Sequence, residues 1–212
     1  MKLTVFGATG GIGGHMVRQA LDAGHAVTAV VRDAARFELR HPALEVAAVR
    51  GLTDPDLLLP AVKGSDAVLS GVGSRGRKAG TTASDATRGI LGAMAATGVR
   101  RFVAVSAAPV GPPAEGEGFF GRRILLPIVS AAFKEVYRDL AVMEDLIRNS
   151  GTEWTVFWPP KLVDKAVTGR YRRVVGGNVA RGHTISRADV AHAMLAALGD
   201  PATIGRAVGV AY

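Results

Sequence analysis

The chain lacks cysteine altogether and has few aromatic residues and no long apolar run. None of its 212 residues is cysteine, which excludes disulfide bridges, thiolate metal sites and cysteine nucleophiles, and suits a reducing compartment. No uninterrupted apolar segment approaches the roughly 20 residues that span a bilayer. Because the first expected strand begins at residue 2, there is no room before it for a signal peptide. We therefore expect a cytoplasmic protein that makes no membrane contact.

The chain is basic, with 26 Lys and Arg against 18 Asp and Glu, and its formal net charge is +8. The basic residues are dispersed and form only local clusters, at 75–78, 100–101, 122–123 and 170–173. Few aromatics interleave with them, and no nucleic-acid-binding motif is present. We expect the charge to serve a phosphate-rich cofactor, an anionic substrate and ordinary solvated surface rather than nucleic acid.

The most informative pattern is a glycine-rich turn near the N-terminus. Gly7, Gly10 and Gly13 follow an apolar strand, and from Gly11 onward the apolar residues are spaced for one face of a helix. In a dinucleotide-binding turn one glycine allows a sharp bend, another lets the backbone touch a pyrophosphate, and a third lets the helix pack close to the strand. The amides of the first helical turn then point at the anion. The cofactor-binding residues expected here are Gly7, Thr9, Gly10, Gly11, Ile12 and Gly13.

The rest of the chain alternates apolar strands with helices. Further strands are expected at 26–31, 44–49, 67–70, 101–105 and 154–158, and helices at 84–97, 130–150 and 187–198. Repeated strand–helix units predict a parallel sheet covered on both faces, with a ligand crevice at the carboxyl ends of the strands. With 48% apolar residues the chain can bury a substantial core. We predict a single α/β domain over residues 1–212, a Rossmann-type doubly wound parallel sheet that binds NAD(P).

The second expected strand ends in Val31, Arg32 and Asp33. A carboxylate at this tip favours NAD, whereas an arginine suits the 2′-phosphate of NADP. Arg32 occupies the tip and Arg36 lies one helical turn on, so we predict a preference for NADP. We expect Asp33 to cap the following helix. The alternative is that Arg32 is a solvated charge and Asp33 binds the ribose.

The turns after the fourth and fifth strands complete the expected crevice. Gly73 and Ser74 form a small-residue turn that lets the cofactor pass, and Arg75 can reach its pyrophosphate. After the fifth strand, Ser106 places a hydroxyl where the nicotinamide or the substrate carbonyl should lie, beside Ala107.

At this point the chain resembles the short-chain dehydrogenase superfamily. Conventional members pair such a serine with Tyr-x-x-x-Lys, in which the lysine lowers the pKa of the tyrosine that donates the proton. Here Tyr137 is followed by Ala141 at the lysine position, and Lys134 lies on the wrong side of the tyrosine. Alcohol–ketone chemistry of the conventional type therefore loses its main support.

Several further motifs point to an atypical branch of that superfamily. They lie at 6–10, 31–33, 73–75, 106–107, 159–160, 168–171 and 185–190. Their order and spacing over nearly the whole chain resemble the biliverdin reductase B family, also called flavin reductase (NADPH), within the NmrA-like NAD(P)-binding group. The resemblance implies an NADPH-dependent reductase with broad specificity for flavins and related planar acceptors. The NmrA-like relatives also include proteins that bind the cofactor but act as regulators.

The chain departs from that family at two positions. The family commonly has a histidine after the paired prolines, where this chain has Lys161, and an aspartate after the third strand, where it has Leu52. Lys161 keeps a cation near the expected pocket but changes its proton chemistry. Leu52 leaves adenine contacts to backbone groups or to Asp54, whose alternative role is to cap a helix.

Two long segments, at about 109–128 and 160–184, are expected to form substrate-side loops. The first carries Phe119 and Phe120, which we expect to contact the substrate together with Trp158, although Trp158 also suits the core. The second is expected to contain a strand or hairpin around 171–175. Alternatively, both segments are ordinary surface loops.

We predict an NADPH-dependent reductase that transfers hydride to a planar, anionic small molecule, such as a flavin, a quinone or a biliverdin-like compound. Ser106 and Lys161 are the expected catalytic residues, and Pro159 and Pro160 border the cofactor. The alternative is an NmrA-like redox sensor without turnover, and an isomerase is disfavoured by the missing Tyr–Lys pair. No metal site is expected, because no pair of the five histidines has convincing ligand spacing.

Overall fold

The computed structural model describes residues 1–73, 80–114 and 133–212. Its main element is an eight-stranded sheet with the order β3-β2-β1-β4-β5-β6-β10-β8. The strands are β1 (Lys2–Phe6), β2 (Ala26–Val31), β3 (Leu44–Ala48), β4 (Ala67–Ser70), β5 (Arg101–Val105), β6 (Glu153–Trp158), β8 (Arg172–Val175) and β10 (Arg206–Ala211). All neighbours are parallel except β8 and β10. The predicted Rossmann-type α/β fold in a single domain is confirmed.

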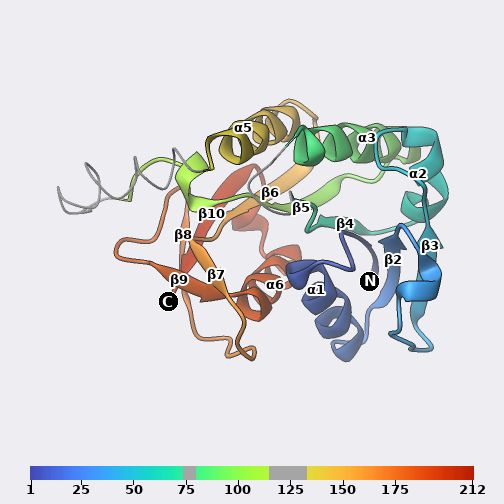
Figure 1. Cartoon of the computed structure of the whole chain (residues 1–212), viewed down its shortest axis with the longest axis horizontal. Coiled ribbons are helices and arrows are strands. Elements are labelled where there is room, and N and C mark those ends of the chain that lie inside the picture. Colours follow the sequence, from blue (N-terminus) through green and yellow to red (C-terminus); the bar gives the residue numbers. More distant parts are fainter. Residues whose placement is uncertain (74–79, 115–132) are drawn as a thin grey trace.

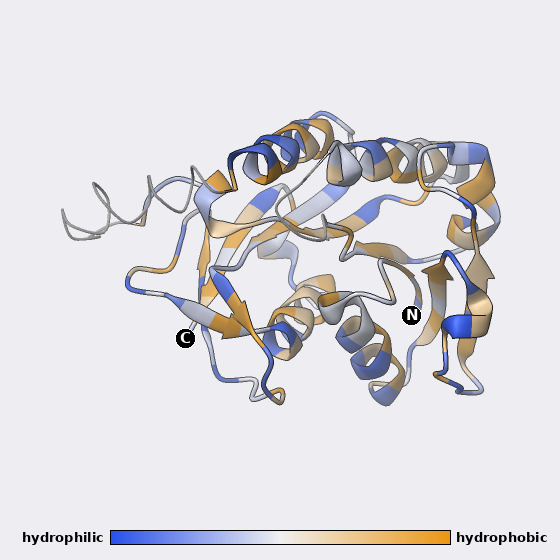
Figure 2. Cartoon of the chain, in the orientation of Figure 1, coloured by the Kyte–Doolittle hydropathy of each residue, from blue (hydrophilic) through white to orange (hydrophobic). Residues whose placement is uncertain are grey.

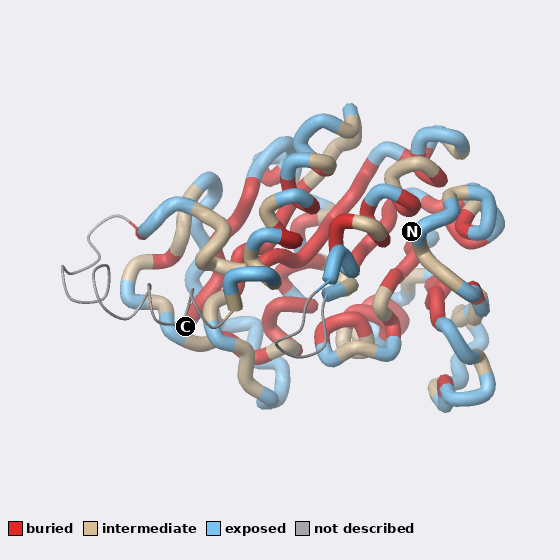
Figure 3. The backbone as a smooth tube through the Cα atoms, turned by 45° about the horizontal axis from the view of Figure 1, so that its top comes forward, coloured by how far each residue is buried: buried red, intermediate tan, exposed pale blue. Residues whose placement is uncertain are grey.

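Helices cover both faces of the sheet (Figure 1). One layer contains α1 (Gly11–Asp22) and α6 (Arg187–Ala196), and the other contains α2 (Pro55–Val62), α3 (Thr82–Thr97) and α5 (Lys134–Arg148). Successive side chains of a strand point to opposite faces, so Leu3 and Val5 of β1 pack in the core beneath α1 and α6, whereas Phe6 packs in the other core. The strands are accordingly buried while the outer turns of the helices are exposed (Figure 3).

Helices α1 and α5 are amphipathic, and several other helices begin at a residue whose side chain caps them. Hydrophilic and hydrophobic residues alternate around the turns of α1 and α5 (Figure 2). The side chains of Asp33, Asp54 and Ser186 each accept a backbone amide at the start of a helix, which confirms the predicted cap at Asp33 and the capping role of Asp54. These caps fix where the chain turns after β2 and after β9 (Thr184–Ser186).

α3 is capped from outside its own sequence. The carboxylate of Asp139 in α5 accepts the amides of Ala83 and Ser84 at 2.8 and 3.0 Å. Asp139 is buried, and the two bonds join α5 to the first turn of α3. This cap explains why α3 begins at Thr82, two residues before the helix expected from the sequence.

The C-terminal third adds strands that the sequence did not predict. β7 (Lys161–Val163) pairs in parallel with β9 to form a separate two-stranded sheet. The strand expected around 171–175 is confirmed as β8, but its partner is the distant β10 rather than a neighbouring hairpin strand. Among the described residues, no helix combines the length and apolar character needed to cross a membrane.

Candidate active site

The candidate site lies at the carboxyl edge of the parallel strands. Neighbouring strands end in register there, with Phe6 beside Val30 and Ser70, and Val105 beside Phe157. The turns that leave these strands therefore lie along one edge. In parallel α/β sheets this edge binds ligands at the point where the strand order changes direction, which here lies between β1 and β4.

The turn after β1 depends on its glycines. Gly7 has a φ of +74°, in the left-handed region that favours glycine. A Cβ added to Gly13 would lie 2.0 Å from the carbonyl oxygen of Gly7, so a side chain there would push α1 away from the turn. Gly10 is the N-cap residue of α1 and provides no capping side chain, which leaves first-turn amides open to an anion. Thr9 is exposed beside them, while Ile12 anchors the helix in the core.

The turn after β4 packs against the turn after β1. A Cβ on Gly7 would lie 2.8 Å from the carbonyl carbon of Gly71, and a Cβ on Gly71 would lie 3.2 Å from the nitrogen of Gly13. The backbones of the two turns therefore touch where side chains would separate them. Gly73 follows in open, exposed space. The two glycine turns form the backbone cradle that a pyrophosphate requires.

Two arginines follow β2. Arg32 comes directly after the strand and Arg36 ends a short 3₁₀ helix, and both are exposed. The carboxylate of Asp33 between them accepts the amide of Ala35 at 3.0 Å. Asp33 uses one carboxylate oxygen as a cap, and the exposed cations of Arg32 and Arg36 precede and follow it in the sequence.

Ser106 is the buried polar group at the end of β5. The residue is 8% exposed, and its Oγ has no hydrogen-bond partner within the described part of the chain. Its amide donates to the carbonyl of Phe157 at 2.8 Å, and the amide of Ala108 donates to that of Pro159 at 2.9 Å. The turns after β5 and β6 therefore run side by side, with Ala107 half-buried between these bonds. A buried hydroxyl without a partner is uncommon in native proteins, and a bound ligand would satisfy it.

The paired prolines lead from β6 to the predicted catalytic lysine. Pro159 is buried and Pro160 half-buried, and Lys161 begins β7 opposite Thr184 of β9. Lys161 is exposed, and none of the ion pairs formed by the described residues uses its ammonium group. The lysine thus follows β6 as Ser106 follows β5. Whether the two face each other across a bound acceptor stays a prediction.

Trp158 is a core residue that also supports the loop after β5. It is buried, and its indole nitrogen donates to Oε1 of the buried Glu144 at 2.8 Å. A Cβ on Gly111 would lie 2.5 Å from the indole, so the loop rests directly on the ring. Its contact with a substrate stays a prediction. Four other predicted contact residues lie outside the described residues: Ser74, Arg75, Phe119 and Phe120.

A family model described as NAD(P)H-binding matches residues 7–201, which includes both glycine turns and the strands between them. The chain belongs to this NAD(P)H-binding family. The match implies a nicotinamide cofactor and an oxidoreductase-like protein.

Solved structures with the same fold cover the chain from end to end. A Burkholderia pseudomallei protein, provisionally described as exported, is 26% identical, with a TM-score of 0.78 and 100% of each chain covered. SP1627 of Streptococcus pneumoniae TIGR4, provisionally named an NADH-flavin reductase, is 24% identical, with a TM-score of 0.79 and coverage of 100% and 99%. ChuY of Escherichia coli O157:H7, named an anaerobillin reductase, is 23% identical, with a TM-score of 0.80 and coverage of 100% and 97%.

This NAD(P)H-binding protein does not build the conventional tyrosine–lysine pair. Tyr137 lies on α5 and is half-buried, and its burial raises its pKa above the usual value. The conventional mechanism requires the opposite shift. Its ring lies 6.2 Å from that of Phe133, in a tilted arrangement. Tyr137 therefore lacks the lowered pKa with which the conventional tyrosine donates its proton.

The segment after β7 is bound to α6 by Asp189, a residue in the first turn of that helix. Oδ1 of this buried carboxylate accepts the amides of Thr168 and Gly169 at 2.8 and 2.9 Å, and Oδ2 accepts the hydroxyl of Tyr212 at 2.6 Å. Desolvation acts to raise the pKa of Asp189, but the hydrogen bonds outweigh it and lower the pKa to about 2. The ionised carboxylate holds part of the 160–184 segment on the protein.

The two predicted substrate-side segments meet at one amide. Nδ2 of Asn178 donates to the carbonyls of Ala108 and Pro112, each at 2.8 Å. The sequence provides no sign of this contact, because it joins residues about 70 positions apart. Arg187, the first residue of α6, was not among the predicted site residues either, although a cation at a helix N-terminus opposes the helix dipole.

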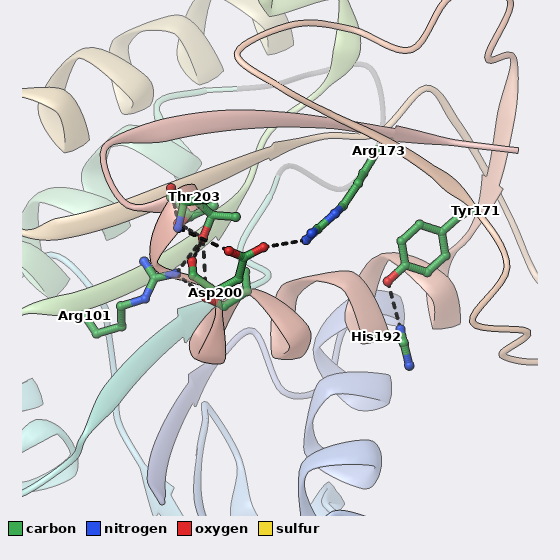
Figure 4. A network of polar contacts seen from close by, with 9 residues as sticks. Arg101, Tyr171, Arg173, His192, Asp200 and Thr203 are labelled. Carbon is green, nitrogen blue, oxygen red and sulfur yellow. Dashed lines mark hydrogen bonds and ion pairs between the residues drawn. The ribbon is translucent and has the colours of Figure 1, made fainter.

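The amino end of the sheet carries a closed polar network. Arg101 begins β5 and is buried. It donates to three oxygens, the carbonyls of Glu153 and Ala197 and the hydroxyl of Thr203 (Figure 4). The same view shows the ion pair of Asp200 with Arg173 and the hydrogen bond between Tyr171 and His192. Both contacts are 2.8 Å long. The Arg101 contacts tie β5 to the segment between α6 and β10.

Proposed function

We propose that this NAD(P)H-binding protein is an NADPH-dependent reductase whose acceptor is a planar conjugated molecule such as a flavin, a quinone or a linear tetrapyrrole, with a preference for acceptors that carry a phosphate or a carboxylate. The observation that carries the proposal is the buried hydroxyl of Ser106, which has no hydrogen-bond partner among the described residues and lies on the same sheet edge as the glycine turns. A nicotinamide ring is expected at this end of the crevice when the pyrophosphate lies at the turn after β1. The reductase names of SP1627 and ChuY support the reaction class.

The protein contributes binding and orientation to this reaction. When bound, the cofactor supplies a hydride from its nicotinamide ring, and the acceptor takes up that hydride together with a proton from water. Ser106 donates a hydrogen bond to the carboxamide or to the acceptor. Lys161 attracts the anionic acceptor and stabilises the negative charge that develops on it. Because the reacting atoms are held together, a dedicated catalytic acid is not required.

The preference for NADPH rests on the tip of β2. Arg32 and Arg36 present two cations where Asp33 is occupied as a cap, and a 2′-phosphate is the anion that distinguishes the two cofactors. The paired prolines and Ala107 complete the contacts on the nicotinamide side.

The experiment is an acceptor panel in which the fall of NADPH absorbance is followed with FMN, riboflavin, a soluble quinone and biliverdin. We expect NADPH oxidation with at least one conjugated acceptor, and slower oxidation of NADH. Tight NADPH binding without oxidation across the panel would contradict the proposal and favour a redox-sensing regulator.

The same panel tests Lys161, because FMN and riboflavin differ in a phosphate group. Lys161→Ala should lower turnover with FMN more than with riboflavin, and Lys161→Arg should retain part of it. Lys63→Ala, an exposed lysine at the opposite end of the sheet, is the matched control. Equal effects on both flavins would remove Lys161 from the acceptor site.

A further inference from the structure

The side chain of Arg187 lies on the phosphate-binding turn. A Cβ added to Gly11, the first residue of α1, would lie 2.5 Å from Cδ and 2.9 Å from Nε of Arg187. Gly11 does not have the positive φ of Gly7, so its backbone does not itself require glycine. The neighbouring arginine therefore explains why a residue without a side chain suits this position.

Arg187 is held there by two contacts of α6. Its Nη1 lies 2.7 Å from Oδ1 of Asp164, with the side chains 30% and 84% exposed respectively. The side-chain amide of Gln19 in α1 donates to the backbone carbonyl of Ala188 at 2.9 Å and fixes the spacing between the two helices. The guanidinium thus reaches from the first turn of α6 to the first turn of α1.

This placement is electrostatically unfavourable without an anion. Arg187 sits at the N-terminus of α6 and against the N-terminus of α1, and both helix ends carry partial positive charge. Among the described residues the ion-pair partner of the guanidinium is Asp164, which is largely exposed and so binds weakly, while the buried carboxylate of Asp189 lies in the first turn of α6. A diphosphate on the turn would meet open amides and a guanidinium together, an arrangement that Asp164 alone does not match.

We propose that Arg187 binds the pyrophosphate of the nicotinamide cofactor and that Asp164 is its counter-ion only while the cofactor is absent. Cofactor binding exchanges the carboxylate for the phosphates and releases the start of the 164–170 segment, while Asp189 keeps the segment attached at Thr168 and Gly169. The inference rests on the cofactor binding of the proposed function and not on hydride transfer.

The test is a set of equilibrium titrations with NADPH, NADH, ADP-ribose and 2′-AMP. Arg187→Gln retains much of the aliphatic side chain and removes the charge. It should weaken NADPH, NADH and ADP-ribose by about 10- to 100-fold, because all carry the diphosphate, and leave 2′-AMP unchanged. Arg187→Lys should retain part of the affinity. Arg138→Ala, which removes an exposed ion pair on α5, is the matched control and should change nothing.

Asp164→Asn should have the opposite effect on affinity for the diphosphate ligands. Removing the competing carboxylate should strengthen binding of the three diphosphate ligands by roughly two- to fivefold, since an exposed ion pair is worth less than about 1 kcal/mol. The residue is exposed, so this variant also tests the inference if Arg187→Gln folds poorly. Unchanged diphosphate affinity in Arg187→Gln, or weaker binding in Asp164→Asn, would overturn it. If the acceptor panel shows no NADPH oxidation while the variants change the diphosphate affinities as predicted, only the reductase proposal is refuted.

Discussion

The two ends of β5 carry buried polar groups that differ in their hydrogen bonding. At the amino end, Arg101 donates to the carbonyls of Glu153 and Ala197 and to the Thr203 hydroxyl. At the carboxyl end, the Ser106 hydroxyl is equally buried but meets no partner in the described ranges. Both residues cost free energy to desolvate, and only the first recovers it within the fold. A buried polar group whose hydrogen bonds are made within the fold indicates a role in stability. A buried polar group without a partner among the described residues indicates a position for hydrogen bonding to a ligand.

The same difference extends along the two edges of the sheet. The carboxyl edge has two glycine turns in backbone contact and a helix start with open amides, so its hydrogen-bonding capacity faces outward. At the amino edge polar groups pair with one another, as when Asp66 accepts the amide of Lys2 at 2.7 Å. Variants at the two edges should therefore separate stability from cofactor binding.

The largest effect on stability is expected at Arg101. Arg101→Met keeps a long apolar side chain but leaves the Glu153 and Ala197 carbonyls without their donor. The free energy of unfolding should fall by about 3 kcal/mol, measured by urea denaturation. NADPH affinity of the folded fraction should not change. An Arg101→Met protein that loses NADPH affinity and keeps its stability would contradict the assignment of the amino edge to stability.

A large effect on binding without a change in stability is expected at Arg32. Arg32→Ala removes charge-assisted bonds to the 2′-phosphate and should cost about 1.5 to 3 kcal/mol of NADPH binding, or roughly 10- to 100-fold in Kd. NADH affinity should change little. Arg206→Ala, an exposed arginine at the start of β10, is the control at the amino edge. Equal losses for NADPH and NADH would refute the assignment of Arg32.

Local chemistry made much of this site predictable. Nearby residues decide where a glycine turn joins a strand to a helix, where a residue such as Asp33 caps a helix, and how apolar residues alternate along a strand. Contacts set by packing were not predictable. The Asp139 cap of α3 joins residues more than 50 positions apart, and β8 finds its partner only after the chain has passed through α6. The missing partner of Ser106 is likewise visible only when its surroundings are in place.

Ser106 provides the most direct test of the account. On one preparation of Ser106→Ala, the initial rate of NADPH oxidation with FMN should be measured alongside the free energy of unfolding. The account predicts a rate roughly tenfold lower, or about 1.4 kcal/mol. Because the hydroxyl has no hydrogen-bond partner in the described part of the chain, stability should stay within about 0.5 kcal/mol of the unaltered protein or rise. An unchanged rate combined with a clear loss of stability would show that Ser106 serves the fold, and it would contradict the central claim.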